Sequence, residues 1–140
     1  MGTQTPLKVV CIDDEPSILR LLLLASEDEP DVDIVATTTT RREFHNLVEQ
    51  HRPDVLVIDL GLRGSPQEPG RSDERQLLEL GSGLQLIEAA RSVVPDATIA
   101  VFTGRDGFDV ASRSAGADVY VEKPHVHELW PAIRQSRAAR

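Results

Sequence analysis

Short apolar runs rich in β-branched residues alternate with segments of helical periodicity along most of the sequence. Such runs between turn signals are typical of buried strands. They occupy residues 8–12, 32–36, 55–58, 98–102 and 119–121. Because regular alternation of strand and helix favours a parallel sheet with helices on both faces, the sequence predicts an open α/β fold with right-handed crossovers.

The segments between these runs place apolar residues at the spacing of one helix face. The clearest sets are Ile18, Leu21, Leu22 and Ala25, then Leu84, Ile87, Ala90 and Val94, and finally Val126, Leu129, Trp130 and Ile133. The fourth segment, 105–115, offers a core only Phe108, Val110, Ala111 and Ala115. We therefore expect its helix to dock less firmly than the others, as suits a moving part.

Length and composition indicate one domain spanning residues 1–140, with flexible tails at 1–6 and 138–140. No segment has the roughly 20 apolar residues of a membrane span. The N-terminus does not resemble a secretory signal, and the single Cys11 cannot form an internal disulfide, so we expect a cytoplasmic location. The net charge of -8 argues against direct binding of nucleic acid.

Polar residues follow four of the predicted strands, at the edge where ligands bind in such sheets. They are Asp13 and Asp14 after the first strand, Asp59 after the third, Thr103 after the fourth and Lys123 after the fifth. Three crowded carboxylates repel one another unless a cation lies among them, and hard oxygen ligands suit Mg²⁺. The sequence therefore predicts a magnesium site at this edge.

A carboxylate beside such a site can attack phosphorus and form an acyl phosphate. Asp59 is the best candidate nucleophile because its strand is predicted to be central, whereas Asp13 and Asp14 would hold the metal. Lys123 would supply a fixed positive charge, and the Thr103 hydroxyl would donate to a phosphoryl oxygen.

Each residue alone also fits a simpler role. Asp13 and Asp14 suit the first turn of a helix, Asp59 and Thr103 suit turns, and Lys123 could be a solvated lysine. It is the joint pattern at four strand ends that is specific.

That joint pattern, with the Lys123-Pro124 dipeptide, resembles the receiver domains of response regulators in two-component signal transduction. The resemblance extends from Leu7 to about Arg137. It implies a flavodoxin-like (βα)5 doubly wound parallel sheet of strand order 2-1-3-4-5 and a cis Lys123–Pro124 bond. It also implies that Tyr120 and Thr103 act as switch residues, and that Mg²⁺ is bound by Asp13, Asp14, Asp59 and the backbone carbonyl of Gly61.

The function implied is acceptance of a phosphoryl group on Asp59 from a sensor histidine kinase or a histidine phosphotransfer protein. Phosphorylation would alter the surface of the fourth helix, fifth strand and fifth helix, and so control a downstream protein or a fused effector. The domain would assist its own phosphotransfer without being an enzyme otherwise, and a homodimer is compatible with the pattern. Because Gly61 has no side chain to orient water, we expect slow self-dephosphorylation.

The sequence departs from the family between Asp59 and Gly83, the glycine expected to open the third helix. Residues 62–82 form an enlarged connection in which Ser72 and the residues after it suggest a short extra helix. This insertion is either a flap that affects partner choice or a tolerated mobile segment. Arg63 replaces the usual proline.

Two other functions would also use a strand-end aspartate or this fold. A phosphorylation-independent interaction module would usually lack one of the acidic, threonine or lysine positions, and all are present here. A phosphatase that uses Asp59 as a transient nucleophile would usually carry a second aspartate where Gly61 stands.

Overall fold

The computed structural model describes residues 5–60, 73–104, 107–123 and 125–139. For residues 73–82 it describes the backbone alone. Its strands are β1 (Leu7–Ile12), β2 (Val32–Thr38), β3 (Val55–Ile58), β4 (Thr98–Thr103) and β5 (Val119–Glu122). Its helices are α1 (Pro16–Ser26), α2 (Arg41–His51), α3 (Asp73–Val93), α4 (Asp109–Ala115) and α5 (Val126–Ala138).

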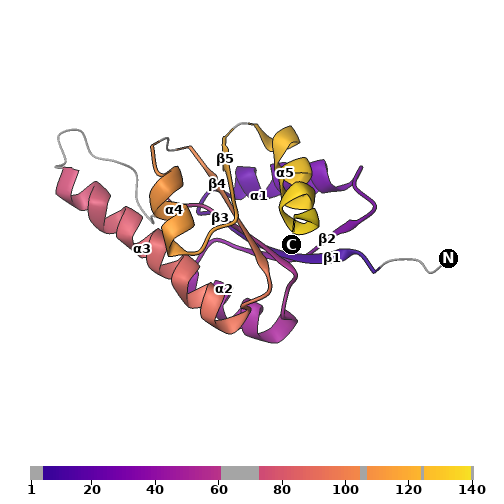
Figure 1. Ribbon diagram of the computed structural model, residues 1–140, viewed down its shortest axis with the longest axis horizontal. Helices are drawn as coiled ribbons and strands as arrows, with labels where there is room; N and C mark the ends of the chain where they lie inside the picture. Colours follow the sequence, from indigo (N-terminus) through magenta and orange to yellow (C-terminus); the bar gives the residue numbers. More distant parts are fainter. Residues whose placement is uncertain (1–4, 61–72, 105–106, 124, 140) are drawn as a thin grey trace.

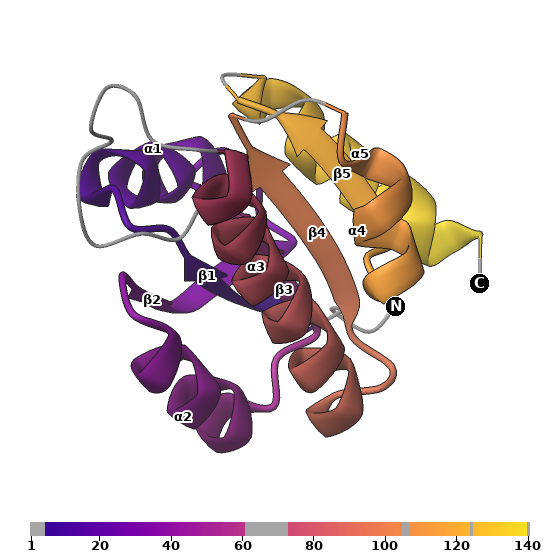
Figure 2. The same ribbon diagram turned by 90° about the vertical axis from the view of Figure 1, so that its left-hand side faces the viewer.

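The strands form a parallel sheet in the order β2-β1-β3-β4-β5. Helices α1 and α5 cover one face of this sheet, and α2, α3 and α4 cover the other (Figures 1 and 2). This arrangement confirms the predicted flavodoxin-like fold with strand order 2-1-3-4-5. From β1 the chain adds β2 on one side and then β3, β4 and β5 on the other, so the strand order switches between β1 and β3. In such a sheet the ligand site lies beyond the carboxyl ends of these two strands.

Successive residues of the central strands point to opposite faces, and both faces are buried. In β1, Val10 and Ile12 enter the core beneath α2 and α3, whereas Val9 and Cys11 enter the core beneath α1 and α5. All four residues of β3 are buried as well. Burial on both sides explains why these strands read as continuous apolar runs without polar alternation.

The third helix begins earlier than predicted. Residues 73–82 do not form a separate short helix but are the first part of α3, which runs through Gly83 without a break. The expectation that Gly83 opens the helix is therefore wrong. The remaining residues of the predicted insertion, 62–72, lie outside the described residues.

The fourth helix is shorter than predicted, because it begins at Asp109. Val110 was expected to contribute to the core, but it is 78% exposed. Its place is taken by Ser112, which is fully buried, while Phe108 is half-buried against the core. A serine in that position buries little apolar surface, so α4 has a weaker hydrophobic contact with the sheet than the other helices do.

One arginine joins several elements at the end of the sheet where β4 begins. The Arg91 guanidinium, on α3, donates hydrogen bonds to the carbonyls of Pro95 (2.9 Å), Ala97 (2.6 Å) and Gly116 (2.6 Å). It also pairs with the Asp118 carboxylate at 2.7 Å. The segment between α4 and β5 is thereby attached to α3 and to the start of β4.

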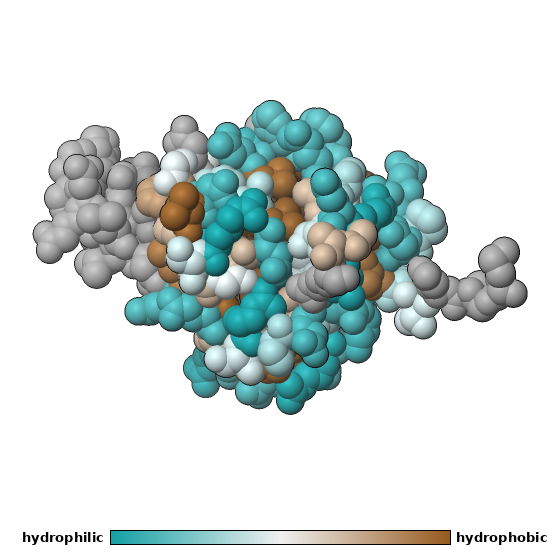
Figure 3. All heavy atoms as spheres, in the orientation of Figure 1, coloured by the Kyte–Doolittle hydropathy of each residue, from teal (hydrophilic) through white to brown (hydrophobic). Residues whose placement is uncertain are grey.

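No helix in the described ranges has both the length and the apolar composition that crossing a bilayer requires. Most of the face seen in Figure 3 is hydrophilic, and apolar atoms show in patches between polar side chains.

Candidate functional site

The predicted acidic residues meet where β1 and β3 end. Asp13 and Asp14 follow β1, and Asp59 follows β3. The Asp59 N–H donates to the carbonyl of Ile12 (3.1 Å), which holds the two strand ends together beyond their ladder. One carboxylate oxygen from each of the three aspartates lies within 4.8 Å of the others. The structure therefore brings together three carboxylates that follow two different strands in the sequence.

Two of these aspartates are nearly inaccessible to solvent. Asp13 is 2% exposed and Asp59 is 5% exposed, whereas Asp14 is half-buried. Asp13 accepts a hydrogen bond from the backbone N–H of Glu15 at 2.9 Å. A buried carboxylate needs such donors or a cation nearby, because water does not solvate it fully.

Lys123 supplies a cation from the end of β5. Its backbone N–H donates to the carbonyl of Thr103 (2.8 Å), which fixes the chain as it leaves the sheet. Its ammonium lies 2.7 Å from Asp13 Oδ2 and 3.6 Å from Asp59 Oδ1. Lys123 therefore bridges the first and third strand ends, with its shorter contact to Asp13.

Burial and neighbouring charges together shift the pKa of both Asp13 and Lys123. Burial, followed by repulsion from Asp59, raises the pKa of Asp13 to about 6, although Lys123 and the Glu15 N–H act in the opposite direction. Burial alone would lower the pKa of Lys123, but attraction to Asp59 and Asp13 outweighs burial, so that this pKa is raised. At neutral pH the site thus holds a charged lysine among acids that repel one another.

The two predicted switch residues lie on the neighbouring strands. Thr103 ends β4, is fully buried and pairs in register with Glu122 of β5. Tyr120 is half-buried and packs against the core beneath α3. Thr103 and Tyr120 are therefore on β4 and β5, the two strands that follow β3 in the sheet.

A close contact that sequence reasoning did not identify lies beside Asp59. A Cβ atom at Gly83 would lie 2.7 Å from the carbonyl oxygen of Leu60 and 3.0 Å from its Cα. The Leu60 side chain is fully buried in the core. The residue after Asp59 is thus held on one side by the core and on the other by α3. The one available signal was a glycine inside a helical pattern, which usually has a packing reason.

The donor set suits a hard divalent cation. Asp13, Asp14 and Asp59 offer oxygen ligands. Burial and, after it, repulsion from Asp59 raise the pKa of Asp13, and a bound cation would relieve that repulsion. Gly61, expected to add its carbonyl, and Pro124, of the expected cis bond, both lie outside the described residues.

No protein-family model matches the sequence. The chain is 32% identical over 150 residues to a protein-glutamate methylesterase/protein-glutamine glutaminase of Nitrobacter hamburgensis, covering 99% of this chain and 36% of that protein. It is 30% identical over 131 residues to the virulence transcriptional regulatory protein PhoP of Salmonella choleraesuis, covering 91% of this chain and 50% of that protein. The chain thus spans between about a third and half of the length of these relatives.

The chain is also similar to solved structures of response regulators. A two-component response regulator of the LuxR family from Aurantimonas has a TM-score of 0.77 and 26% identity, covering 97% of this chain and 88% of that chain. A CheY-like response regulator receiver domain protein from Methanospirillum hungatei has a TM-score of 0.71 and 19% identity, covering 97% and 100%. The second likeness concerns the fold alone.

The sheet order, the acidic strand ends and these likenesses define the class: the chain has the fold and the acidic strand ends of receiver domains of the response-regulator type. In this chain α3 is the longest of the described helices, at 21 residues, and its first part lies within the insertion predicted at 62–82.

Proposed function

We propose that this receiver domain accepts a phosphoryl group on Asp59 from a sensor histidine kinase or a histidine phosphotransfer protein in a Mg²⁺-dependent reaction. The observation that carries the proposal is the buried Asp59 carboxylate, grouped with those of Asp13 and Asp14 and lying 3.6 Å from the Lys123 ammonium. Such a site combines a nucleophile, a hard-metal donor set and a fixed positive charge.

Asp59 would act as the nucleophile. Its carboxylate oxygen forms a bond to phosphorus while the bond from phosphorus to the donor histidine nitrogen breaks, and that nitrogen keeps the electron pair. A bound Mg²⁺ would neutralise charge on the transferring phosphoryl oxygens. Asp13 and Asp14 would hold that ion, because they follow β1 and face Asp59 across the strand ends.

Lys123 and Thr103 would stabilise the product. The Lys123 ammonium would pair with a phosphoryl oxygen, and the Thr103 hydroxyl would donate to another. Movement of Thr103 would leave space that Tyr120 fills, and the α4–β5–α5 surface would then favour a second packing. Phosphorylation shifts the population between two arrangements because it stabilises one of them more than the other.

The domain would act as a switch in phosphorelay signalling and not as an enzyme with a substrate of its own. Gly61 would contribute its carbonyl to the metal but no side chain to orient an attacking water, so the phosphoryl group should be lost slowly. The switched surface would control a downstream protein, a fused effector or a second copy of the chain. We place this activity in the cytoplasm, where histidine kinases present their phosphoryl donors.

The direct test is the intact mass of the protein after incubation with a small acyl phosphate and Mg²⁺. We expect the native chain to gain one phosphoryl group, Asp59→Asn to gain none, and the matched control Asp33→Asn, at an exposed site on β2, to gain one. If the native chain gains none from the acyl phosphate and none from a histidine kinase, the domain is a phosphorylation-independent interaction module.

A further inference from the structure

We propose that a groove between β5 and α5 binds a segment of a partner protein that presents cationic side chains next to apolar ones. The inference deepens the proposed function and rests on it in one respect: it names the kind of partner that the switched surface would engage. The groove has a volume of about 650 Å³. Its apolar part is formed by Val121 of β5 and by Pro131 and Ala132 of α5.

The charged side chains that line this groove are two glutamates, which lie beside two histidines. Glu122 and Glu128 line it together with His125 and His127, and the described lining residues include no lysine or arginine. Glu128 Oε2 lies 2.7 Å from His125 Nδ1, and its side chain is 55% exposed. Two carboxylates beside apolar surface favour a partner that carries positive charge, since complementary charge determines which segments dock.

Pro131 removes one backbone donor within α5. Proline has no N–H, so residue 131 cannot donate to the carbonyl of His127, four residues earlier. Both Pro131 and His127 line the groove. In the proposed complex an arginine or lysine side chain of the partner would donate to this carbonyl.

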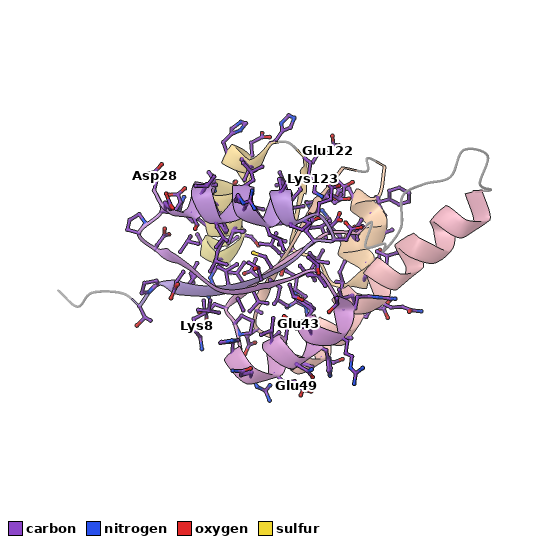
Figure 4. The ribbon with its side chains drawn as sticks, turned by 180° about the vertical axis from the view of Figure 1, so that it is seen from behind. Lys8, Asp28, Glu43, Glu49, Glu122 and Lys123 are labelled. Atoms are coloured by element: carbon purple, nitrogen blue, oxygen red, sulfur yellow. The ribbon has the colours of Figure 1, made fainter. Side chains whose placement is uncertain are left out.

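The groove lies directly beside the acidic site. Glu122 and Lys123 are consecutive at the end of β5, where the Glu122 side chain is exposed and Lys123 contacts Asp13 and Asp59 (Figure 4). Tyr120, the predicted switch residue, also lines the groove. A change in the position of Lys123 or Tyr120 would thus reach the groove through β5.

The test is isothermal titration of unphosphorylated full-length protein with an acetylated, amidated heptapeptide of alternating leucine and arginine. We expect saturable binding that the double variant Glu122→Gln/Glu128→Gln weakens about tenfold, since two charge-assisted contacts are lost. The matched control is Glu43→Gln/Glu49→Gln on α2, which makes the same change in net charge on another part of the molecule (Figure 4). Glu49 also pairs with a histidine and has a side-chain exposure of 54%, close to that of Glu128. This control should bind within a factor of about two of the native protein.

A second variant separates the groove from the bulk charge of the protein. Gln135→Trp adds volume at an exposed position that lines the groove and leaves the net charge unchanged, so it should also weaken binding. Equal losses in the groove variant and the α2 control, or no saturable binding by the native protein, would overturn the inference. Because the measurement uses unphosphorylated protein, its result is independent of whether Asp59 accepts a phosphoryl group.

Discussion

Lys123 makes its shorter ion pair with Asp13, at 2.7 Å, and its longer one with Asp59, at 3.6 Å. The ammonium thus neutralises the proposed metal ligand at least as strongly as it does the proposed nucleophile. A cation bound among the aspartates would compete with Lys123 for Asp13, so the lysine and the metal are expected to be thermodynamically coupled.

Replacement of Lys123 by methionine should expose this coupling. The variant leaves two buried carboxylates without their cation, so we expect a loss of about 3 kcal/mol in the free energy of unfolding. Mg²⁺ should restore more stability to the variant than it adds to the native protein. Urea unfolding with and without excess Mg²⁺ measures both effects. Lys8→Met is the matched control, because Lys8 Nζ donates to a backbone carbonyl, that of His51, and not to the aspartates.

The raised pKa of Asp13 predicts how stability depends on pH without divalent ions. The folded protein binds this proton more tightly than the unfolded chain does. The resulting stabilisation is complete below the ordinary value of 3.8 and is lost as the pH rises through about 6. The loss amounts to at most about 3 kcal/mol. Asp13→Asn cannot undergo it, so in a chelating buffer the variant should be more stable than the native protein at pH 7.5.

That difference between Asp13→Asn and the native protein should shrink towards pH 4.5, where Asp13 is protonated in the folded state. Thermal unfolding across this pH range provides the measurement. Asp33→Asn, at an exposed position, should follow the native curve. A less stable Asp13→Asn at pH 7.5 would mean that the Lys123 ion pair outweighs the combined effect of burial and repulsion from Asp59.

Gly83→Ala should destabilise the fold, although alanine is the better helix former by about 1 kcal/mol. The added Cβ would meet the Leu60 backbone at 2.7 Å, and overpacking of this kind costs about 1–3 kcal/mol. The sign of the change therefore shows whether the clash with Leu60 outweighs the gain in helix propensity. Gly104→Ala is the control, since a Cβ there meets nothing within 4 Å. Denaturant unfolding measures the free energy of unfolding of the two variants. A Gly83→Ala variant more stable than the native protein would refute the prediction.

Much of the fold could be predicted because strands that are buried on both faces consist mainly of apolar residues. The run at 55–58 is apolar throughout and that at 98–102 is apolar after Thr98, and the structure places both strands inside the sheet. The grouping of Asp13, Asp14 and Asp59 followed from topology, since the carboxyl ends of parallel strands meet at one edge.

Other features depended on contacts between segments that are distant in the sequence. Gly83 was expected to open the third helix because the resemblance to receiver domains implies a glycine at that place, yet here α3 runs through Gly83, whose missing side chain allows the helix to contact Leu60. Val110 fitted an apolar pattern but is exposed, because only seven residues form α4 and its orientation buries Ser112 instead. The shorter contact of Lys123 with Asp13 depends on side-chain rotamers, which the spacing of residues does not specify.

Arg91→Ala should destabilise the domain by about 2–3 kcal/mol, because it removes the donor for several carbonyls and for the partly buried Asp118 carboxylate. Arg113→Ala is the control. Its guanidinium pairs with Asp109 at an exposed position, where such pairs contribute less than about 1 kcal/mol. Thermal unfolding of both variants checks the prediction, and equal losses would contradict the proposed role of Arg91.

The same arginine determines how the fourth helix can move. Arg91 attaches the chain at Gly116, directly after α4, to α3 and to the start of β4, at the end of the sheet remote from the aspartates. A displacement that began near Thr103, as the proposed switch requires, would leave the Gly116 end in place. The helix would then rotate about that end, and its displacement would be largest at Asp109.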